Sequence, residues 1–398
     1  MAAPSSSARS PVAVAAASLA VLILSACAED DMTIDLEGTA SACAEAPPLL
    51  LPGETRGLVL VNAYWLQEEA ARALRRGEAT AARVEEALAE TAAMGAAAVR
   101  ASAFNDDPAK AGDSAIQVAR LVYDETALRG LDLVLARAHA HGVRLVLPLG
   151  NFWDAFGGAR QYVAWAGLPD PVEGDPRFFS DRAVVDHYRA HVTALLSRTS
   201  TVDGIRWGDH PAVLAWELLN EPRPGPLASD REALAAWVRE LAAHVKSLAP
   251  GHLVGTGEEG LDLELFARNA SSPDVDYASA HLYPEGPGIP AFFTGAVGAD
   301  FLAARLDAAR SVGKPLVVGE FGLRNDGRLT LDQRRAVYRG WLTCMRRGGG
   351  AAAGVWMLAH DDRPDAWDAY QFKWWEGTAP DDRVNAYVDV LRDAAAAW

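Results

Sequence analysis

Short apolar runs rich in Val, Leu and aromatic residues recur along the chain, and a stretch of helical periodicity separates most of them. This alternation predicts βα units that build a parallel sheet. The predicted strands cover residues 58–65, 97–104, 143–149, 213–220, 253–258, 277–283, 315–320 and 354–358. Eight such repeats predict an α/β fold, a single (β/α)8 TIM barrel, over residues 53–398.

The segments between the predicted strands carry helix start signals. Ser-Asp-Arg-Glu at 229–232 and Thr-Leu-Asp-Gln at 330–333 both have the form of a capping box. In the segment 125–141, Leu128, Leu131 and Leu135 fall on one face, which we expect to cover the sheet. Periodicity does not distinguish a closed barrel from an open doubly wound sheet. No Gly-rich nucleotide-binding fingerprint follows the first strand, however, and this favours the barrel.

Polar and aromatic side chains lie in the predicted strands or just after them. They are Arg100, Asn151, Asn220, Glu221, His281, Tyr283, Glu320 and Trp356. In a (β/α)8 barrel the carboxyl ends of all strands open on one mouth, so residues far apart in sequence meet there. We therefore predict that the functional site lies at this mouth.

Glu221 and Glu320 are the two carboxyls that suggest a chemistry. Cleavage of a glycosidic bond needs a proton for the leaving oxygen and a negative charge facing the developing oxocarbenium centre. A separation of about 5 to 5.5 Å gives retention, whereas about 6.5 to 9.5 Å admits water and gives inversion; the sequence leaves this distance open. We expect a raised pKa for the acid of the pair, and Arg100 to hold a neighbouring carboxyl ionised. Tyr283 is a candidate donor to the nucleophile, and His281 is a candidate to orient a carboxylate or the sugar.

Several Trp residues at or beyond the strand ends are candidates to stack on sugar rings. They are Trp65, Trp153, Trp356, Trp374 and Trp375. Packing in the core is the alternative for each of them. Asn151, just after the third strand, is a further candidate for substrate binding.

Other polar residues compete for these roles. Glu217 shares strand parity with Glu221 but lies one layer deeper, where we expect a buried structural group. Glu258 and Glu259 end the fifth strand and are candidates to bind sugar hydroxyls or to close a hydrogen-bond network.

His187 and His191 stand four residues apart on a predicted helix, which is a metal-ligand spacing. No Glu follows His187, as a metalloprotease motif requires, so we predict a solvated helix face and no metal site.

The first 52 residues differ from the rest of the chain. Arg9 precedes an apolar run that ends in Leu-Ser-Ala-Cys at 24–27, a pattern typical of a secretory signal. About 13 apolar residues are too few to span a bilayer, which needs roughly 20. The small residues before Cys27 resemble a bacterial lipobox, so we predict a lipoprotein signal peptide over 1–26 and lipidation of Cys27. An ordinary signal peptide cleaved nearby is the alternative. Residues 27–52, rich in Ala, Pro and acidic residues, are predicted to form a flexible tether.

The formal net charge of −16, without a basic cluster, argues against nucleic acid as a partner. An exported chain can pair Cys43 with Cys344, although Cys43 lies in the predicted tether, so the sequence leaves this pairing open. Export with an anchor at Cys27 predicts a cell-surface or periplasmic lipoprotein that meets the membrane only through its lipid. We expect a monomer.

The segments Trp216–Pro222 and Gly319–Gly322 resemble the paired signature of family 5 glycoside hydrolases. Further segments resemble the endo-β-1,4-mannanase branch of that family, and they are Asn62–Trp65, Asn151–Gly158, Gly257–Gly260 and His281–Pro284. Together these motifs cover about Gly57 to Trp356. Their order and spacing make the resemblance specific.

The resemblance implies a (β/α)8 barrel, retention of configuration, and neither a metal nor a cofactor. It implies that Glu221 is the acid/base and that Glu320 is the nucleophile. Asn220 would hold the 2-hydroxyl of the sugar whose bond is cleaved, and Trp356 would form the floor of that subsite. The other catalytic-site residues that it implies are Arg100, His281 and Tyr283. The implied partner is a β-mannan polysaccharide or oligosaccharide.

The segment 361–377 departs from the corresponding loop of typical mannanases, so the polymer is less closely defined than the reaction. Two classes of function remain open. One is a hydrolase that prefers β-1,4-mannan, with β-1,4-glucan as the alternative polymer. The other is a non-catalytic surface lipoprotein that binds glycan. Retention of both Glu221 and Glu320 favours the hydrolase, because a binding protein has no need of two apposed carboxyls.

Overall fold

The computed structural model describes residue 39 and residues 41–285, 291–360, 369–373 and 386–398. The predicted signal peptide, Cys27, Trp374 and Trp375 lie outside these ranges. Within the described residues, no helix is both long and apolar enough to cross a membrane.

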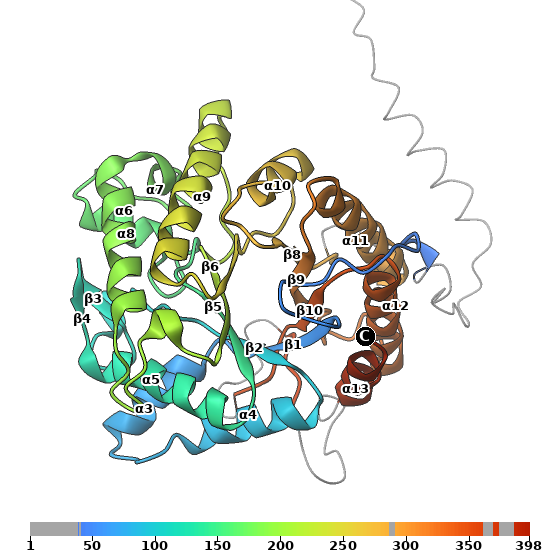
Figure 1. Cartoon of the computed structure of the whole chain (residues 1–398), viewed down its shortest axis with the longest axis horizontal. Helices are drawn as coiled ribbons and strands as arrows, with labels where there is room; N and C mark the ends of the chain where they lie inside the picture. Colours follow the sequence, from blue (N-terminus) through green and yellow to red (C-terminus); the bar gives the residue numbers. More distant parts are fainter. Residues whose placement is uncertain (1–38, 40, 286–290, 361–368, 374–385) are drawn as a thin grey trace, which may run out of the picture. The chain divides into compact units, whose positions relative to one another are not determined.

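Eight parallel strands form the centre of the fold (Figure 1). They are β1 Leu58–Asn62, β2 Ala98–Arg100, β5 Arg144–Pro148, β6 Val213–Glu217, β7 Leu253–Gly255, β8 Ala278–Leu282, β9 Leu316–Phe321 and β10 Ala352–Val355. The sheet order is β7-β6-β5-β2-β1-β10-β9-β8, and a parallel bridge between Gly255 and Tyr277 joins its two ends. The predicted (β/α)8 barrel is confirmed, because each predicted strand overlaps one of these eight.

Helices surround the strands (Figure 1). They are α3 Leu66–Arg75, α4 Ala82–Ala93, α5 Glu125–Ala140, α6 Gly158–Trp165, α7 Arg177–Ser180, α8 Arg182–Ser197, α9 Ala228–Leu248, α10 Leu263–Ala270, α11 Thr294–Ser311, α12 Leu331–Arg347 and α13 Val388–Ala397. Short 3-10 turns occupy Pro108–Lys110, Trp207–Asp209 and Ala291–Phe293. The sequence did not predict the antiparallel hairpin of β3 Gln117–Ala119 and β4 Val122–Tyr123, because its strands are too short to show a period.

The predicted helix signals were confirmed in one case and displaced in another. Thr330 and Gln333 form the reciprocal capping box at the start of α12. Helix α9 begins before the predicted motif, and the Asp230 carboxylate accepts from the backbone N–H of Leu227. Leu128 and the other predicted apolar positions of α5 are buried against the sheet.

The chain is fixed to the barrel well before β1. Cys43 is buried and joined to Cys344 of α12 by a disulfide. The backbone N–H of Leu49 donates to the carbonyl of Gly349, and Leu51 lies in a core cluster with the first residues of several strands. This part of the predicted tether is therefore packed against the barrel. The pairing that the sequence left open is present.

His187 and His191 of α8 contradict the predicted solvated helix face, because both side chains are buried. His187 Nε2 lies 2.8 Å from Gln117 Oε1, and His191 Nδ1 lies 3.2 Å from the Tyr123 hydroxyl. Burial lowers the pKa of each His to about 3, so both rings are neutral at ordinary pH. The β3–β4 hairpin supplies Gln117 and Tyr123, and this unpredicted hairpin covers the helix face.

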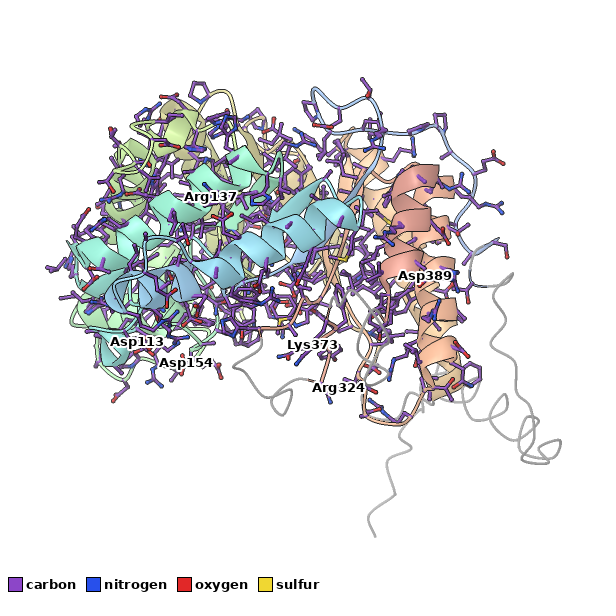
Figure 2. All side chains as sticks on the ribbon, turned by 90° about the horizontal axis from the view of Figure 1, so that it is seen from below. Asp113, Arg137, Asp154, Arg324, Lys373 and Asp389 are labelled. Atoms are coloured by element: carbon purple, nitrogen blue, oxygen red, sulfur yellow. A yellow bond between two sulfur atoms is a disulfide. The ribbon has the colours of Figure 1, made fainter. Side chains whose placement is uncertain are left out.

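The two ends of the barrel are distinct. In Figure 2 the loops that follow the strands, marked by Asp113, Asp154, Arg324 and Lys373, lie along the lower edge. Arg137, near the carboxyl end of α5, lies toward the opposite edge. The lower edge is therefore the mouth at which the predicted site residues should meet.

Candidate active site

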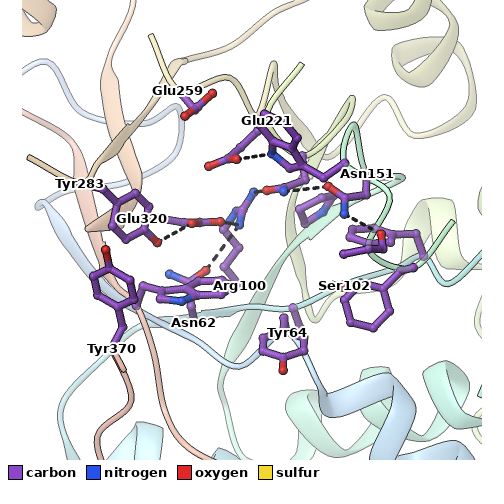
Figure 3. Close-up of a pocket in the computed structure, with 18 residues that line it drawn as sticks. Asn62, Tyr64, Arg100, Ser102, Asn151, Glu221, Glu259, Tyr283, Glu320 and Tyr370 are labelled. Carbon is purple, nitrogen blue, oxygen red and sulfur yellow. Dashed lines mark hydrogen bonds and ion pairs between the residues drawn. The ribbon is translucent and has the colours of Figure 1, made fainter. Parts of the chain in front are cut away.

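A cavity of about 420 Å³ opens at the carboxyl ends of the strands (Figure 3). Most of the predicted site residues line it, and they are Arg100, Asn151, Trp153, Asn220, Glu221, Tyr283, Glu320 and Trp356. The structure thus brings together residues that span more than half of the sequence.

Trp65 does not belong to this cavity, and its predicted role in substrate binding is wrong. Its indole is fully buried, with Nε1 donating to the carbonyl of Leu358 at 3.0 Å and the ring packed edge-on against His360. The preceding residue, Tyr64, lines the cavity instead and stacks on Trp356 with ring centroids 5.6 Å apart. The chain passes from β1 into α3 at this point, and that turn directs Tyr64 inward and Trp65 into the core.

Glu320, near the end of β9, is held by donors on both of its oxygens. Arg100 Nη1 lies 2.5 Å from Oε1, and the Tyr283 hydroxyl donates to Oε2 at 2.6 Å. Burial, and then the nearby Glu320 charge, raise the pKa of Tyr283 well above its usual value, so Tyr283 stays protonated as a donor. Arg100 and Tyr283 thus both contact the predicted nucleophile.

Arg100 is the centre of a buried polar network. Its Nε donates to Glu217 Oε2 at 2.8 Å, and its Nη2 donates to Asn220 Oδ1, also at 2.8 Å. Asn220 in turn donates to Asn151 Oδ1 at 3.0 Å. Glu217 is fully buried and also accepts from Tyr277, which confirms the expected structural role. The network fixes both the Arg100 guanidinium and the Asn220 amide, because each of these groups is hydrogen-bonded to more than one neighbour.

Glu221 follows β6 with a backbone φ of +53°, which is uncommon for a residue other than Gly. Its N–H donates to the carbonyl of Gly257 at 2.8 Å, and this bond holds the strained turn. Trp153 Nε1 donates to Oε2 at 2.6 Å, and His281 Nδ1 lies 2.8 Å from Oε1. The turn and the two ring partners together aim the Glu221 carboxylate into the cavity (Figure 3).

Glu221 and His281 shift each other's pKa in opposite directions. Burial raises the pKa of Glu221, but the hydrogen bonds from His281 and Trp153 and the charge of Arg100 outweigh burial and lower it. Burial lowers the pKa of His281, but the Glu320 and Glu221 carboxylates outweigh it and raise that pKa. The lowered pKa of Glu221 is opposite in direction to the raised pKa expected for the acid of the pair, and His281 Nδ1 lies 2.8 Å from its carboxylate oxygen.

Comparisons with known proteins agree with this geometry. Residues 53–342 match the model of glycoside hydrolase family 5, β-mannosidase-like. The chain belongs to glycoside hydrolase family 5. Two rice proteins (Oryza sativa subsp. japonica) are each 36% identical to it. The match to a putative mannan endo-1,4-β-mannosidase 5 covers 75% of this chain and 65% of the rice protein. The match to mannan endo-1,4-β-mannosidase 8 covers 78% of this chain and 88% of the rice protein.

Solved structures support the same fold. The endo-β-1,4-mannanase of Thermotoga petrophila is similar with a TM-score of 0.74 at 24% identity, covering 87% of this chain and 78% of its own. A family 5 mannosidase from Rhizomucor miehei is similar with a TM-score of 0.71 at 23% identity, covering 86% and 93%.

The two carboxyls of this family 5 protein lie close together. One oxygen of Glu221 and one of Glu320 are within 4.8 Å of each other. So close an approach of the two oxygens favours direct attack by one carboxylate over a site that holds a water between the two carboxyls.

The same two carboxyls and His281 have ligand atoms close enough for a metal ion. Arg100, however, places its positive charge 2.5 Å from Glu320 and opposes a cation there. His281 is already engaged with Glu221. The donor set of this family 5 site thus fits proton transfer and nucleophilic attack better than metal binding.

The two rival carboxyls have different surroundings. Glu258 accepts from Thr256 and Asn269 and is buried, so it closes a hydrogen-bond network, as one of its predicted alternatives stated. Burial raises its pKa to about 8. Glu259 lines the cavity as an ion-pair partner of Arg223, and burial is the first cause of its raised pKa.

Several residues that line the cavity were not predicted individually from the sequence. They are Asn62, Tyr64, Ser102, Phe104, Phe156 and Tyr370. The position of Asn62 and Tyr64 at the end of the first predicted strand is a signal that would have found them. Tyr370 has no such signal, because it comes from the segment after β10 that departs from the family pattern.

Proposed function

We propose that this protein is a retaining endo-β-1,4-mannanase that cleaves mannan, glucomannan or galactomannan by double displacement. The observation that carries the proposal is the approach of Glu221 and Glu320 oxygens to within 4.8 Å across the cavity. Each carboxyl has its own set of donors, so each can take a different role. The named relatives support the choice of polymer.

In the first step the Glu320 carboxylate attacks the anomeric carbon while the bond to the leaving oxygen breaks. Glu221 delivers a proton to that oxygen, and His281, which shares a proton with Glu221 over 2.8 Å, supplies it. The result is a covalent ester between Glu320 and the sugar. Arg100 and Tyr283 keep the attacking carboxylate in place during this step.

In the second step water attacks the same carbon, and the ester bond to Glu320 breaks. Glu221 takes the proton of that water, so the pair returns to its starting state. Attack from opposite faces in succession restores the original configuration. Asn220, held by Arg100 and Asn151, is placed to bind the 2-hydroxyl, and Trp356, stacked on Tyr64, provides a flat surface for the ring.

The proposal is tested by product analysis on mannan, glucomannan, galactomannan, xylan and cellulose. We expect internal cleavage of the β-mannans and, by NMR, a β-anomer as the first-formed reducing end. Cleavage of cellulose alone would favour a β-1,4-glucan hydrolase of the same family. Binding to mannan without any cleavage would instead favour the glycan-binding lipoprotein.

We further propose that the chain is exported and held at a membrane through a lipid on Cys27. The Cys43–Cys344 disulfide supports export, because such bonds persist in oxidising compartments. Full-length protein expressed in a bacterium is labelled with radioactive palmitate and partitioned in detergent. We expect label and detergent partitioning for the wild type and neither for Cys27→Ala. Equal behaviour of the two forms would contradict the anchor.

A further inference from the structure

Tyr370 is a cavity residue that comes from outside the recurring βα units. Its ring lies beside that of Tyr283, with centroids 5.2 Å apart and the planes at 66°, an edge-to-face contact (Figure 3). Such contacts favour one relative orientation of two aromatic rings. Burial, and then the charge of Glu285, raise the pKa of Tyr370, so its hydroxyl is neutral. Arg324 Nε donates to that hydroxyl at 3.2 Å.

The backbone around Tyr370 is fixed on both sides. The N–H of Asn325, in the loop after β9, donates to the carbonyl of Ala369 at 2.7 Å. On the other side, Phe372 exchanges backbone hydrogen bonds with Met357 and Ala359 in the loop that carries Trp356. Phe372 itself is fully buried. The described segment 369–373 is thus attached to two loops of the mouth, and this attachment sets the position of the Tyr370 ring.

Gly322 is the residue that lets the two rings meet near the nucleophile. A Cβ at this position would lie 2.8 Å from Cδ1 of Tyr370, closer than real contacts allow, and 3.0 Å from Cε1 of Tyr283, which is a tight contact. Gly322 is two residues after Glu320 on the same strand end. The two tyrosines therefore pack over the backbone that carries the nucleophile.

Tyr283 depends on such packing, because it lies one residue beyond β8 and is outside the strand ladder. Its hydroxyl must stay in place to donate to Glu320 Oε2 at 2.6 Å. Resting on the proposed function, we propose that Tyr370 is a positioning residue. Its ring holds Tyr283 in the orientation that aligns the Glu320 carboxylate for attack on the anomeric carbon.

The experiment is a double-mutant cycle with Tyr370→Ala and Tyr283→Phe, measured as kcat and KM on a mannan oligosaccharide. If Tyr370 acts through Tyr283, removing the hydroxyl of Tyr283 makes the state of Tyr370 irrelevant to Glu320. We expect kcat to fall about 10- to 100-fold in each single variant, with little change in KM. We expect the double variant to match Tyr283→Phe. Independent, multiplied losses would overturn the proposal, as would a wild-type kcat in Tyr370→Ala.

Tyr370→Phe is the matched control. It keeps the ring contact and loses the hydroxyl, which bonds to Arg324 and Glu285, so we expect kcat within about twofold of the wild type. A loss as large as that of Tyr370→Ala would contradict positioning through the ring. If Tyr370→Ala does not fold, Tyr370→Leu, which keeps most of the bulk without an aromatic edge, takes its place in the cycle.

Failure of the proposed function remains distinguishable from failure of this inference. If the wild type does not cleave mannan, the activity proposal fails at the first measurement, and the cycle is run on the polymer that it does cleave. A mechanism-based fluoro-sugar that labels Glu320 gives a second readout, the rate of formation of the covalent ester. The wild type and the three variants of the cycle should show the same non-additive pattern in that rate.

Discussion

The indole Nε1 of Trp153 donates to Oε2 of Glu221 over 2.6 Å, and the Arg223 guanidinium lies 4.6 Å from the centre of the same indole. One ring thus contacts both the carboxyl of the proposed acid/base and a cation that is paired with Glu259. Trp153 was predicted as a sugar-stacking residue. Its hydrogen bond contributes to the lowered pKa of Glu221.

Trp153→Phe should change the pH dependence of the enzyme. The hydrogen bond from Trp153 lowers the pKa of Glu221, so its loss raises that pKa. Because Glu221 and His281 share one proton, a higher pKa of Glu221 raises the pH at which the pair loses that proton, and the basic limb of the kcat/KM profile should move upward. Trp165→Phe, the same substitution on α6, is the control and should leave the profile unchanged. A downward shift in Trp153→Phe would contradict this role.

Azide should distinguish the roles of the two carboxyls. Glu221→Ala should lower kcat by about 10²- to 10⁴-fold on substrates with poor leaving groups. Added azide should then attack the ester on Glu320 and give a β-glycosyl azide. In Glu320→Ala, azide should enter from the vacated face and give the α-anomer from an activated donor. NMR identifies the anomer of each azide product. An α-azide from Glu221→Ala and a β-azide from Glu320→Ala would reverse the roles of the two carboxyls.

Trp65→Phe should affect stability and leave substrate binding intact. The variant loses the 3.0 Å bond to the buried carbonyl of Leu358, which should cost about 1 to 3 kcal/mol of unfolding free energy in urea. KM should stay within about twofold of the wild type, since the ring does not reach the cavity. Trp356→Ala is the comparison and should raise KM. A raised KM in Trp65→Phe would restore the original prediction of sugar binding.

Loss of the Cys43–Cys344 bond should lower the unfolding free energy by about 2 to 5 kcal/mol, because the bond closes a loop with a sequence separation of 301 residues. Unfolding in urea of the double variant Cys43→Ala/Cys344→Ala measures this effect. Activity at 25 °C should be unchanged, since Cys344 lies near the carboxyl end of α12, away from the mouth. Wild-type protein treated with a reductant should match the variant, and a change in kcat would contradict the separation of bond and site.

Glu258→Gln should alter how stability depends on pH. Burial raises the pKa of Glu258 in the folded chain to about 8, from an ordinary value of 4.5. The folded state therefore binds more protons between these values, so this group makes the wild type less stable as pH rises from 4.5 to 8. Glu258→Gln does not lose stability in this way. Its unfolding free energy relative to that of the wild type should therefore increase by on the order of 2 to 4 kcal/mol across this window. Urea unfolding at pH 5 and pH 8 measures it. Parallel curves for the two proteins would show that Glu258 is ionised when folded.

Much of the fold and the catalytic pair follow from the sequence. The eight apolar runs mark the strands because each strand of a parallel barrel is buried on both faces and must be almost wholly apolar. Polar residues that end such runs are expected at the mouth of the barrel. Glu221 and Glu320 could therefore be predicted as a pair without a measured distance. Arg100, His281 and Tyr283 could be predicted as site residues for the same reason.

Other features depend on contacts between segments that are distant in sequence. Trp65 and Tyr64 are neighbours with similar rings, and only the turn from β1 into α3 decides which of them faces the cavity. His187 and His191 are buried by a hairpin whose strands are too short to leave a pattern.

The tertiary structure also decided the direction in which the pKa of Glu221 shifts. The pKa of Glu221 depends on hydrogen bonds from His281 and Trp153 and on the charges of His281 and Arg100, and these three residues come from three other strand ends. Tyr370 reaches the nucleophile because its segment is bonded to two other loops. The sequence by itself determined the barrel and the pair of carboxyls, because hydrophobic periodicity is local. The protonation and support of that pair came from packing, because burial and charge are properties of the folded neighbourhood.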